Sequence, residues 1–337
     1  MAFMLLLKSL RGEKLPRFPV WLMRQAGRYM PQYRELRQKE RDFLSFCKNV
    51  ELATRVSLLP LELLDVDAVI IFSDILVPLE PMGVKVEFVE GEGPVLYWDG
   101  KVESLRKLSC EQTDFVNQVI RGVKALVKDV PVIGFCGAPF TLMAYMVEGG
   151  SGKDFKKSKL FMWQRREDYR KLMNLLVESL VEYLRGQIGA GADLLQVFDS
   201  WAMHMPYEDF EEYAKTYLRR LFEEVKRIKD IPLIYFFRGS GSFLKALEGL
   251  PLDALSVDWT VDLPSAMKES PKAFQGNMDP SLLYCDEELI VEKTLEFLRC
   301  IPRKTKYVFN LGHGLAPDME LSKVKLLVDT VKGYKLP

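Results

Sequence analysis

Short apolar runs alternate with helical patterns along the 337-residue chain, and this alternation limits the possible folds more than any other feature. Proline, glycine or charged residues bound each run, as is usual for buried parallel strands. The runs lie at residues 19–23, 67–72, 131–136, 193–198, 232–237, 254–259, 272–276 and 306–310. This repetition predicts an α/β protein with a closed (β/α)8 TIM barrel, formed by a single domain over residues 1–337.

The segments between the runs show the periodicity of amphipathic helices. Four groups of residues would each share a helical face: Leu172, Leu176, Leu180 and Tyr183; Phe210, Tyr213, Tyr217 and Leu221; Val291, Leu295 and Leu298; and Leu321, Val324, Val328 and Val331. Residues 84–89 instead alternate apolar and polar side chains before a glycine-rich turn at 91–94. This pattern predicts a β-hairpin inserted after the second strand.

The composition argues against several functions. Lys+Arg and Asp+Glu are equal at 47 each, so net charge gives no sign of nucleic-acid or membrane binding. No apolar stretch approaches the ~20 residues of a membrane-spanning helix. The five cysteines are scattered without a CxxC pair, which disfavours a disulfide framework or a zinc ribbon and suits a reducing cytoplasm.

Charge is unevenly distributed along the chain. Residues 8–41 contain ten Lys/Arg and three acids, whereas residues 62–99 contain nine acids and a single lysine. These segments could form two solvated faces that attract each other, or the basic segment could serve an anionic ligand. Composition alone leaves both interpretations open.

The loops after the strands would surround one mouth of the barrel, where barrel enzymes carry out their chemistry. Most of these predicted loops begin with polar or charged residues. In strand order the candidates are Arg24 and Arg28, Ser73 and Asp74, Gly137, Thr141 and Tyr145, Asp199 and Ser200, Arg238, Asp262, Asn277 and Asp279, and His313.

Arg24, Arg28 and Asp74 are the most informative of these candidates. A guanidinium group binds carboxylate or phosphate bidentately, and on a helical turn both arginines would point to one side. Surface salt bridges are the alternative for this pair. An unpaired carboxylate after the apolar segment 70–72 would be costly. Asp74 could therefore pair with an arginine, cap the next helix, or hold a cationic or NH-rich ligand.

The histidines and glycines narrow the remaining chemistry. A zinc site needs three or four ligands, but the chain has two histidines, His204 and His313, and no metal-binding spacing. GxSxG, GxGxxG and Walker A sequences are also missing from the chain. The glycines beside His313 could bring backbone close to a ligand, or this histidine could make only a backbone contact. Residues 239–242 could cradle a phosphate or form an ordinary turn.

Several segments are together similar to one known family. They read PVWLMRQAGRY at 19–29, FSD at 72–74, GFCGAPFTL at 134–142, YMVEGG at 145–150, FDSWA at 198–202, VDW at 257–259, QGNMDP at 275–280 and FNLGHG at 309–314. In this order and over nearly the whole chain, they resemble uroporphyrinogen decarboxylase, a family of haem biosynthesis.

The resemblance implies a homodimeric barrel without metal or cofactor that binds a small-molecule tetrapyrrole. Its reaction converts the four acetate side chains of uroporphyrinogen III to methyls and gives coproporphyrinogen III. Asp74 would accept pyrrole NH groups and stabilise a cation on the ring, and Arg24 or Arg28 would donate a proton or hold the leaving carboxylate. The implied substrate-binding residues are Arg24, Gln25, Ala26, Gly27, Arg28, Asp74, Tyr145, Ser200 and His313.

Two segments depart from the family's pattern. Met203, His204 and Met205 follow Ala202 where the family usually continues with glycine, and residues 315–320 replace a proline-rich turn. Neither departure removes an implied contact residue. Two alternatives remain at this point: a zinc-dependent corrinoid or thiol methyltransferase of related barrel fold, and a non-catalytic tetrapyrrole-binding protein.

Overall fold

A curled parallel β-sheet forms the centre of the protein in the computed structural model, which describes residues 4–336 except 90, 92 and 303–305. The sheet order is β1-β4-β5-β6-β7-β8-β9, and all neighbours are parallel. The strands are β1 (Val69–Ile70), β4 (Val132–Gly137), β5 (Leu194–Asp199), β6 (Leu233–Phe237), β7 (Ala254–Ser256), β8 (Ala273–Met278) and β9 (Tyr307–Leu311).

The first predicted strand, residues 19–23, connects the two edges of this sheet. Val20 forms a parallel bridge with Phe309 of β9, and the Asp67 N–H donates to the Val20 carbonyl over 2.7 Å. The segment pairs no further because the chain turns at Leu22, whose carbonyl accepts the Gln25 N–H. The predicted (β/α)8 architecture is therefore confirmed, with its first strand reduced to a bridge and its second to the two residues of β1.

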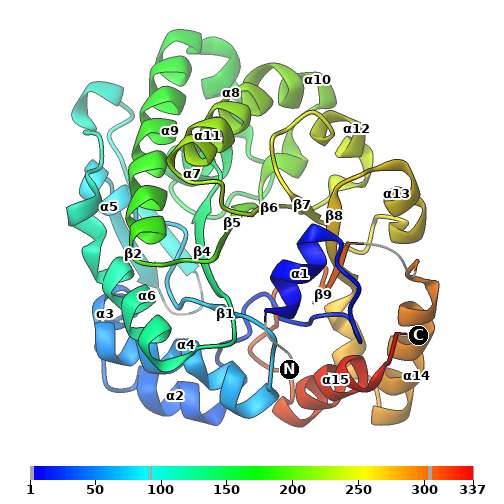
Figure 1. Ribbon diagram of the computed structural model, residues 1–337. Helices are drawn as coiled ribbons and strands as arrows, with labels where there is room; N and C mark the ends of the chain where they lie inside the picture. The colour runs from blue at the N-terminus through cyan, green and yellow to red at the C-terminus, as the bar shows by residue number, and fades with distance from the viewer. Residues whose placement is uncertain (1–3, 90, 92, 303–305, 337) are drawn as a thin grey trace.

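Helices surround the sheet (Figure 1). The helices are α1 (Leu5–Arg11), α2 (Pro31–Arg37), α3 (Phe43–Lys48), α4 (Val50–Leu64), α5 (Leu79–Met82), α6 (Asp114–Leu126), α7 (Pro139–Glu148), α8 (Lys156–Gln164), α9 (Arg166–Gly189), α10 (Tyr207–Asp209), α11 (Lys215–Ile228), α12 (Leu244–Leu247), α13 (Leu263–Glu269), α14 (Glu287–Cys300) and α15 (Leu321–Gly333). A π-helical turn at Phe210–Ala214 precedes α11. Among the described residues, no helix is long and apolar enough to cross a membrane.

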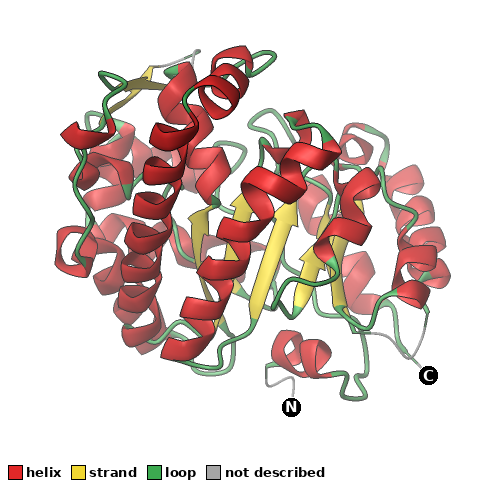
Figure 2. Ribbon diagram, turned by 90° about the horizontal axis from the view of Figure 1, so that it is seen from above, coloured by secondary structure: helices red, strands yellow, loops and turns green. Residues whose placement is uncertain are grey.

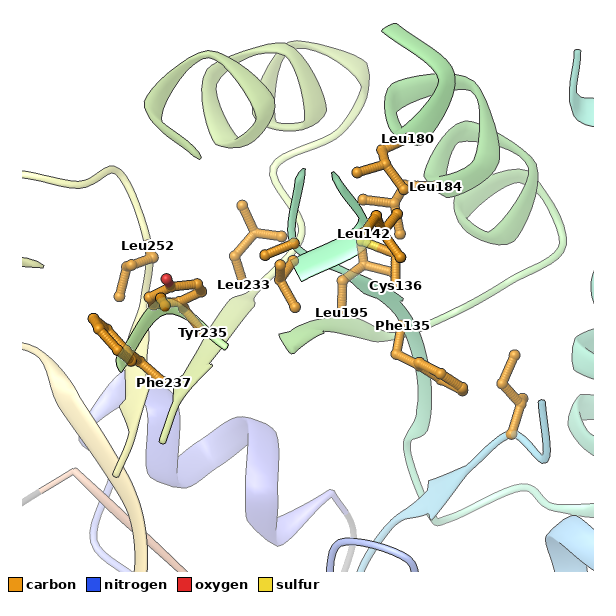
Figure 3. Packing of buried hydrophobic residues seen from close by; sticks show 14 of the residues in the cluster. Phe135, Cys136, Leu142, Leu180, Leu184, Leu195, Leu233, Tyr235, Phe237 and Leu252 are labelled. Carbon is orange, nitrogen blue, oxygen red and sulfur yellow. The ribbon is translucent and has the colours of Figure 1, made fainter. Parts of the chain in front are cut away.

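The predicted helical faces are largely confirmed. Leu172, Leu176, Leu180 and Tyr183 are all buried on α9, and Figure 3 shows Leu180 beside Leu142 and Cys136 in the core. In α14 the buried face is instead Ile290, Thr294 and Leu298, with Val291 and Leu295 only half-buried. Thr294 can replace an apolar residue there because its hydroxyl donates to the Ile290 carbonyl over 2.6 Å.

The interior of the barrel is filled, so a ligand can enter only at its ends. Leu6 and Leu10 of α1 pack against the first residues of the strands, including Leu194 and Ala254, and close the amino end. Above them lies a buried polar layer in which Gln275 accepts from Trp21 Nε1 over 2.8 Å and donates to the Ser256 hydroxyl over 2.9 Å. The carboxyl end of the strands therefore remains as the mouth.

The predicted hairpin is present as the antiparallel pair β2 (Lys85–Val89) and β3 (Gly93–Tyr97). Part of its predicted turn, residue 92, lies outside the described residues. Figure 2 places this hairpin and the N-terminal helix α1 at opposite ends of the strands. Since α1 closes the amino end, the hairpin lies on the side of the mouth.

Candidate active site

The arginine segment adopts an unusual backbone conformation. Arg24 has a φ of 57°, in the left-handed region that few residues other than glycine occupy. The expected helical turn between Arg24 and Arg28 is wrong: these residues form turns, and α2 begins only at Pro31. The Met23 N–H donates to Asn310 Oδ1 over 3.0 Å, and the Leu315 N–H donates to the Met23 carbonyl over 3.0 Å. Contacts from β9 and from the loop after it therefore hold this strained segment in place.

Gln25 anchors the arginine segment through hydrogen bonds to the backbone. Its side chain is fully buried, accepts from the Leu22 N–H over 3.1 Å and donates to the Ala68 carbonyl over 3.0 Å. The Gln25 carbonyl accepts from the Tyr29 hydroxyl over 2.5 Å. The Gln25 amide is thus engaged with backbone and positions its neighbours. Ala26 and Gly27 are half-buried in the turn between the arginines.

Arg24 has an exposed side chain and, among the described residues, no acid within ion-pair distance. The salt-bridge interpretation is therefore wrong for Arg24 and equally for Arg28, although Arg17 of the same basic segment does pair with Asp67 at 2.6 Å. Arg28 lies farther out: its carbonyl accepts from Arg34 Nη1 over 2.7 Å, and its charge acts on Tyr33. Both guanidinium groups are consequently free to bind an anion, and of the two only Arg24 acts on Asp74.

Gly314 makes room for Arg24. A Cβ at this glycine would lie 2.5 Å from Cδ, 2.6 Å from Cγ and 3.1 Å from Cβ of Arg24. The glycine beside His313 therefore leaves space for the arginine side chain. Sequence reasoning missed this role because the packing between the first and last loops is not visible in the chain order.

Gly314→Ala should lower kcat/KM about tenfold or more, because the Arg24 stem must shift and small displacements of positioning groups are costly. Gly333→Ala is the matched control, since a Cβ there meets no atom within 4 Å. Steady-state kinetics and urea denaturation of both variants check this expectation. A folded Gly314→Ala protein with unchanged kcat/KM would contradict it.

Asp74 is half-buried in the loop that follows β1, which ends at Ile70. Its Oδ1 accepts the Leu76 N–H over 2.8 Å, two residues along the loop. The expected helix cap is wrong, because the next helix, α5, begins at Leu79 with Pro78 as its N-cap. Within the described part of the chain, Oδ2 has no hydrogen-bond partner and is not enclosed. Burial raises the pKa of Asp74 to about 6, against the lowering effects of the Leu76 N–H and the Arg24 charge. One carboxylate oxygen therefore remains available to a ligand.

Tyr145 and His313 lie within the electrostatic reach of Arg24. Burial and the Asp74 charge raise the pKa of Tyr145, which the Arg24 charge lowers. Burial, together with Arg24 and Arg238, lowers the pKa of His313 to about 4, so this imidazole is neutral near pH 7. The structure thus brings Arg24, Asp74, Tyr145 and His313 together at one mouth.

A second buried acid, Asp199, fixes the loop that carries Ser200. It accepts from the Thr141 hydroxyl over 2.6 Å and from the Tyr235 hydroxyl over 2.7 Å, and the Trp201 N–H donates to Thr141 over 3.2 Å. Burial raises the pKa of Asp199 to about 6 as well. Ser200 follows as a half-buried residue, and Trp201 packs edge-on against Tyr145 at 5.6 Å.

Three of the candidates after strands do not present a free group to the mouth. Asp262 caps α13, and Asp279 caps the turn Pro280–Tyr284. Asn277 is buried and donates to the Asp258 and Val261 carbonyls. These are common capping and loop-bracing roles of short polar side chains.

The turn at 239–242, a possible phosphate site, already binds a side chain of the protein. The Gly239 N–H donates to Asp258 Oδ2 over 2.6 Å, so a carboxylate of the protein already occupies the position of an anion. In the part of the chain that the structure describes, no group of three His, Cys, Asp or Glu side chains could hold a metal ion. All five cysteines are free thiols.

Fold and site together define a (β/α)8-barrel protein whose mouth sets the unpaired guanidinium group of Arg24 beside a half-buried acid. The chain belongs to the uroporphyrinogen decarboxylase (URO-D) family, which matches residues 2–334. It is 60% identical to the uroporphyrinogen decarboxylase of Aquifex aeolicus over 98% of both chains. Identity to the Hydrogenobaculum enzyme of the same name is 49%, over 97% of this chain and 94% of that one.

Solved structures share the fold at much lower sequence identity. A methyltransferase from Methanosarcina mazei has a TM-score of 0.81 and 20% identity over 98% of each chain. A putative vitamin-B12 independent methionine synthase from Listeria monocytogenes has a TM-score of 0.58 and 12% identity over 96% of each chain. At these identities the likeness concerns the barrel alone.

Proposed function

We propose that this chain decarboxylates the four acetate side chains of uroporphyrinogen III to methyl groups and releases coproporphyrinogen III. The observation that carries this proposal is the Asp74 carboxylate, which keeps one oxygen free beside the unpaired Arg24 in a chain of the URO-D family. The substrate has eight carboxylates and four pyrrole NH groups. Guanidinium groups can bind the substrate carboxylates, and a single central carboxylate can accept the pyrrole NH groups.

The reaction itself needs a sink for electrons. A proton added to a pyrrole carbon gives a ring cation, and the bond between the acetate methylene and its carboxylate then breaks. The released electron pair neutralises the ring, carbon dioxide leaves, and a proton added to the methylene carbon gives a methyl as the ring loses its extra proton. Each turnover therefore consumes one proton per carbon dioxide released.

Asp74 would stabilise this cation. Its free Oδ2 would accept pyrrole N–H groups, and its negative charge would lower the energy of the cationic intermediate. Arg24, the nearer arginine, would hold the reacting carboxylate or deliver a proton, and Arg28 would bind a carboxylate farther out. Tyr145, Ser200 and the neutral His313 would supply an aromatic wall and hydrogen bonds, while Gln25, Ala26 and Gly27 would shape the arginine turn.

The pH profile should report the state of Asp74. Because the ionised form is the active one and the pKa of Asp74 is about 6, kcat/KM should fall as the pH drops below about 6. Asp199 titrates in the same range, so Tyr235→Phe is the control. Loss of the Tyr235 hydrogen bond raises the pKa of Asp199 further. The acidic limb should not move in this variant; a shift to higher pH would assign the limb to Asp199.

The test of the proposed function is an anaerobic assay with uroporphyrinogen III, followed by separation of the products. The expected products carry seven, six, five and finally four carboxylates. A protein that binds the tetrapyrrole without converting it would be a carrier. A zinc-dependent methyltransferase would bind stoichiometric metal and leave uroporphyrinogen unchanged.

We also propose that the whole chain acts as one catalytic domain and assembles as a homodimer in the cytoplasm. The balanced charge and dispersed free thiols are compatible with that setting. Sedimentation analysis of the purified protein checks the oligomeric state. A monomer at micromolar concentration would contradict the dimer proposal.

A further inference from the structure

The proposed substrate carries more negative charge than Arg24 and Arg28 neutralise. Substrate recognition therefore needs further cations at the mouth, and a cation already paired with an acid of the protein would be a poor candidate. Arg238 meets this requirement. It is half-buried, and within the described residues no carboxylate lies within ion-pair distance of its guanidinium group.

The backbone places Arg238 at the mouth. It follows Phe237, the last residue of β6, directly. The next residue, Gly239, has a φ of 71° and donates its N–H to Asp258 over 2.6 Å. A Cβ on Gly239 would lie 3.0 Å from Cβ of Met203, so the turn packs tightly against the β5 loop. The position of the Arg238 backbone is therefore fixed from two sides.

Asp258, the acid that holds the Gly239 turn, is already engaged. Asp258 accepts from the Gly239 N–H, from the Thr260 N–H over 3.1 Å and from the Thr260 hydroxyl over 2.5 Å. With both oxygens occupied by these donors, Asp258 braces the turn without forming an ion pair with Arg238. The guanidinium group remains available to an anion from outside.

Arg238 also lies between two loops of the site. Its charge reaches His313 after β9, together with that of Arg24, and it reaches His204 in the β5 loop, together with those of Lys159 and Asp154. The ring of Phe236, two residues earlier on β6, lies edge-on to the His313 ring with 6.2 Å between the ring centroids. Arg238 therefore belongs to the same mouth as Arg24. It lies on the β5–β6 side, because it follows β6 directly and the next residue, Gly239, packs against Met203 after β5.

We propose that Arg238 is a third substrate-binding arginine, which binds a propionate carboxylate of the tetrapyrrole. This inference rests on the proposed function. The acetates disappear one by one during the reaction, whereas the four propionates persist. A cation on the β5–β6 side, away from the β1 loop that carries Asp74, can hold a persistent carboxylate while another part of the ring reacts.

Arg238→Gln tests this assignment. KM for uroporphyrinogen should rise about 10- to 100-fold, as expected for a lost charge-assisted hydrogen bond, with kcat changed less than about threefold. The pentacarboxylate substrate should show the same factor because it retains all propionates. Arg238→Lys should recover part of the affinity. Arg227→Gln is the matched control, since Arg227 is an exposed arginine on α11 without an ion-pair partner among the described residues.

Several results would overturn the proposal. An unchanged KM in a folded Arg238→Gln protein removes Arg238 from the binding site. An effect that disappears with the pentacarboxylate assigns the contact to an acetate instead of a propionate. Fluorescence titration with the oxidised octacarboxylate uroporphyrin measures binding without turnover. If the wild type binds but does not react, the proposed function fails, while the comparison with Arg238→Gln still tests this inference.

Discussion

Asp74→Asn should lower kcat by roughly 10²–10³-fold while making the folded protein more stable at alkaline pH. The loss of activity follows because a neutral amide cannot offset the charge of a ring cation, and removal of one preorganised electrostatic group costs about this much. Asparagine retains an acceptor for the Leu76 N–H, so the local turn should persist. Steady-state kinetics and denaturation curves on the same preparations measure both effects.

The gain in stability follows from the pKa of Asp74. Burial raises this pKa from 3.8 to about 6, so the folded protein holds the proton more tightly than the unfolded chain. That stabilisation is complete below about pH 4 and is lost as the pH rises through 6. At pH 8 the carboxylate therefore costs on the order of 1–3 kcal/mol, which asparagine would recover. The gain should disappear at low pH.

These opposite effects separate a functional acid from a structural one. If Asp74 were only structural, its substitution would destabilise the folded protein. Activity would then fall only in proportion to the unfolded fraction. Thr141→Val provides the contrast, because it removes a hydrogen bond from the buried Asp199. We expect this variant to be less stable at pH 8, since it leaves a buried charge less well satisfied.

Arg24→Ala and Arg28→Ala should affect different kinetic constants. Arg24 lies within electrostatic reach of Asp74, Tyr145 and His313, so its loss should lower kcat/KM about 10³-fold, mainly through kcat. Arg28 lies farther out, and its loss should raise KM about 10- to 100-fold with a smaller effect on kcat. Steady-state kinetics of the two variants at several salt concentrations measure this difference.

Arg17 provides a structural control for the Arg24 and Arg28 variants. Arg17 belongs to the same basic segment but forms a buried ion pair with Asp67, so Arg17→Ala should lower stability. If Arg24→Ala and Arg28→Ala behave like Arg17→Ala, with lost stability and unchanged KM per folded protein, then the arginines are structural. If both variants raise KM equally and leave kcat unchanged, the different roles proposed for Arg24 and Arg28 are contradicted.

The barrel could be predicted because its strands are local apolar runs and its longer helices are local periodic patterns. The exceptions depend on contacts distant in sequence. Residues 19–23 form only a bridge because the chain must turn at Leu22 to place Arg24. Thr294 joins a buried face because its hydroxyl bonds its own helix.

In the site, too, features set by local sequence could be predicted, and features that depend on contacts distant in sequence could not. The sequence placed Arg24, Asp74, Tyr145, Ser200 and His313 after strands, since position along the chain determines which end of a barrel a loop occupies. It could not distinguish the free Asp74 from Asp262, which only caps a helix. Nor could it show that Gly314 makes room for Arg24, because these residues meet only when the barrel closes.

The most direct test of the account is the first-turnover rate of carbon dioxide release, with protein in excess over uroporphyrinogen. Under these conditions the substrate is bound before reaction, so the rate reports the chemical step. The account predicts that Asp74→Asn binds uroporphyrinogen yet releases carbon dioxide at least about 10²-fold more slowly than the wild type. A first-turnover rate equal to that of the wild type, with the substrate fully bound, would contradict the role of Asp74 in stabilising the ring cation.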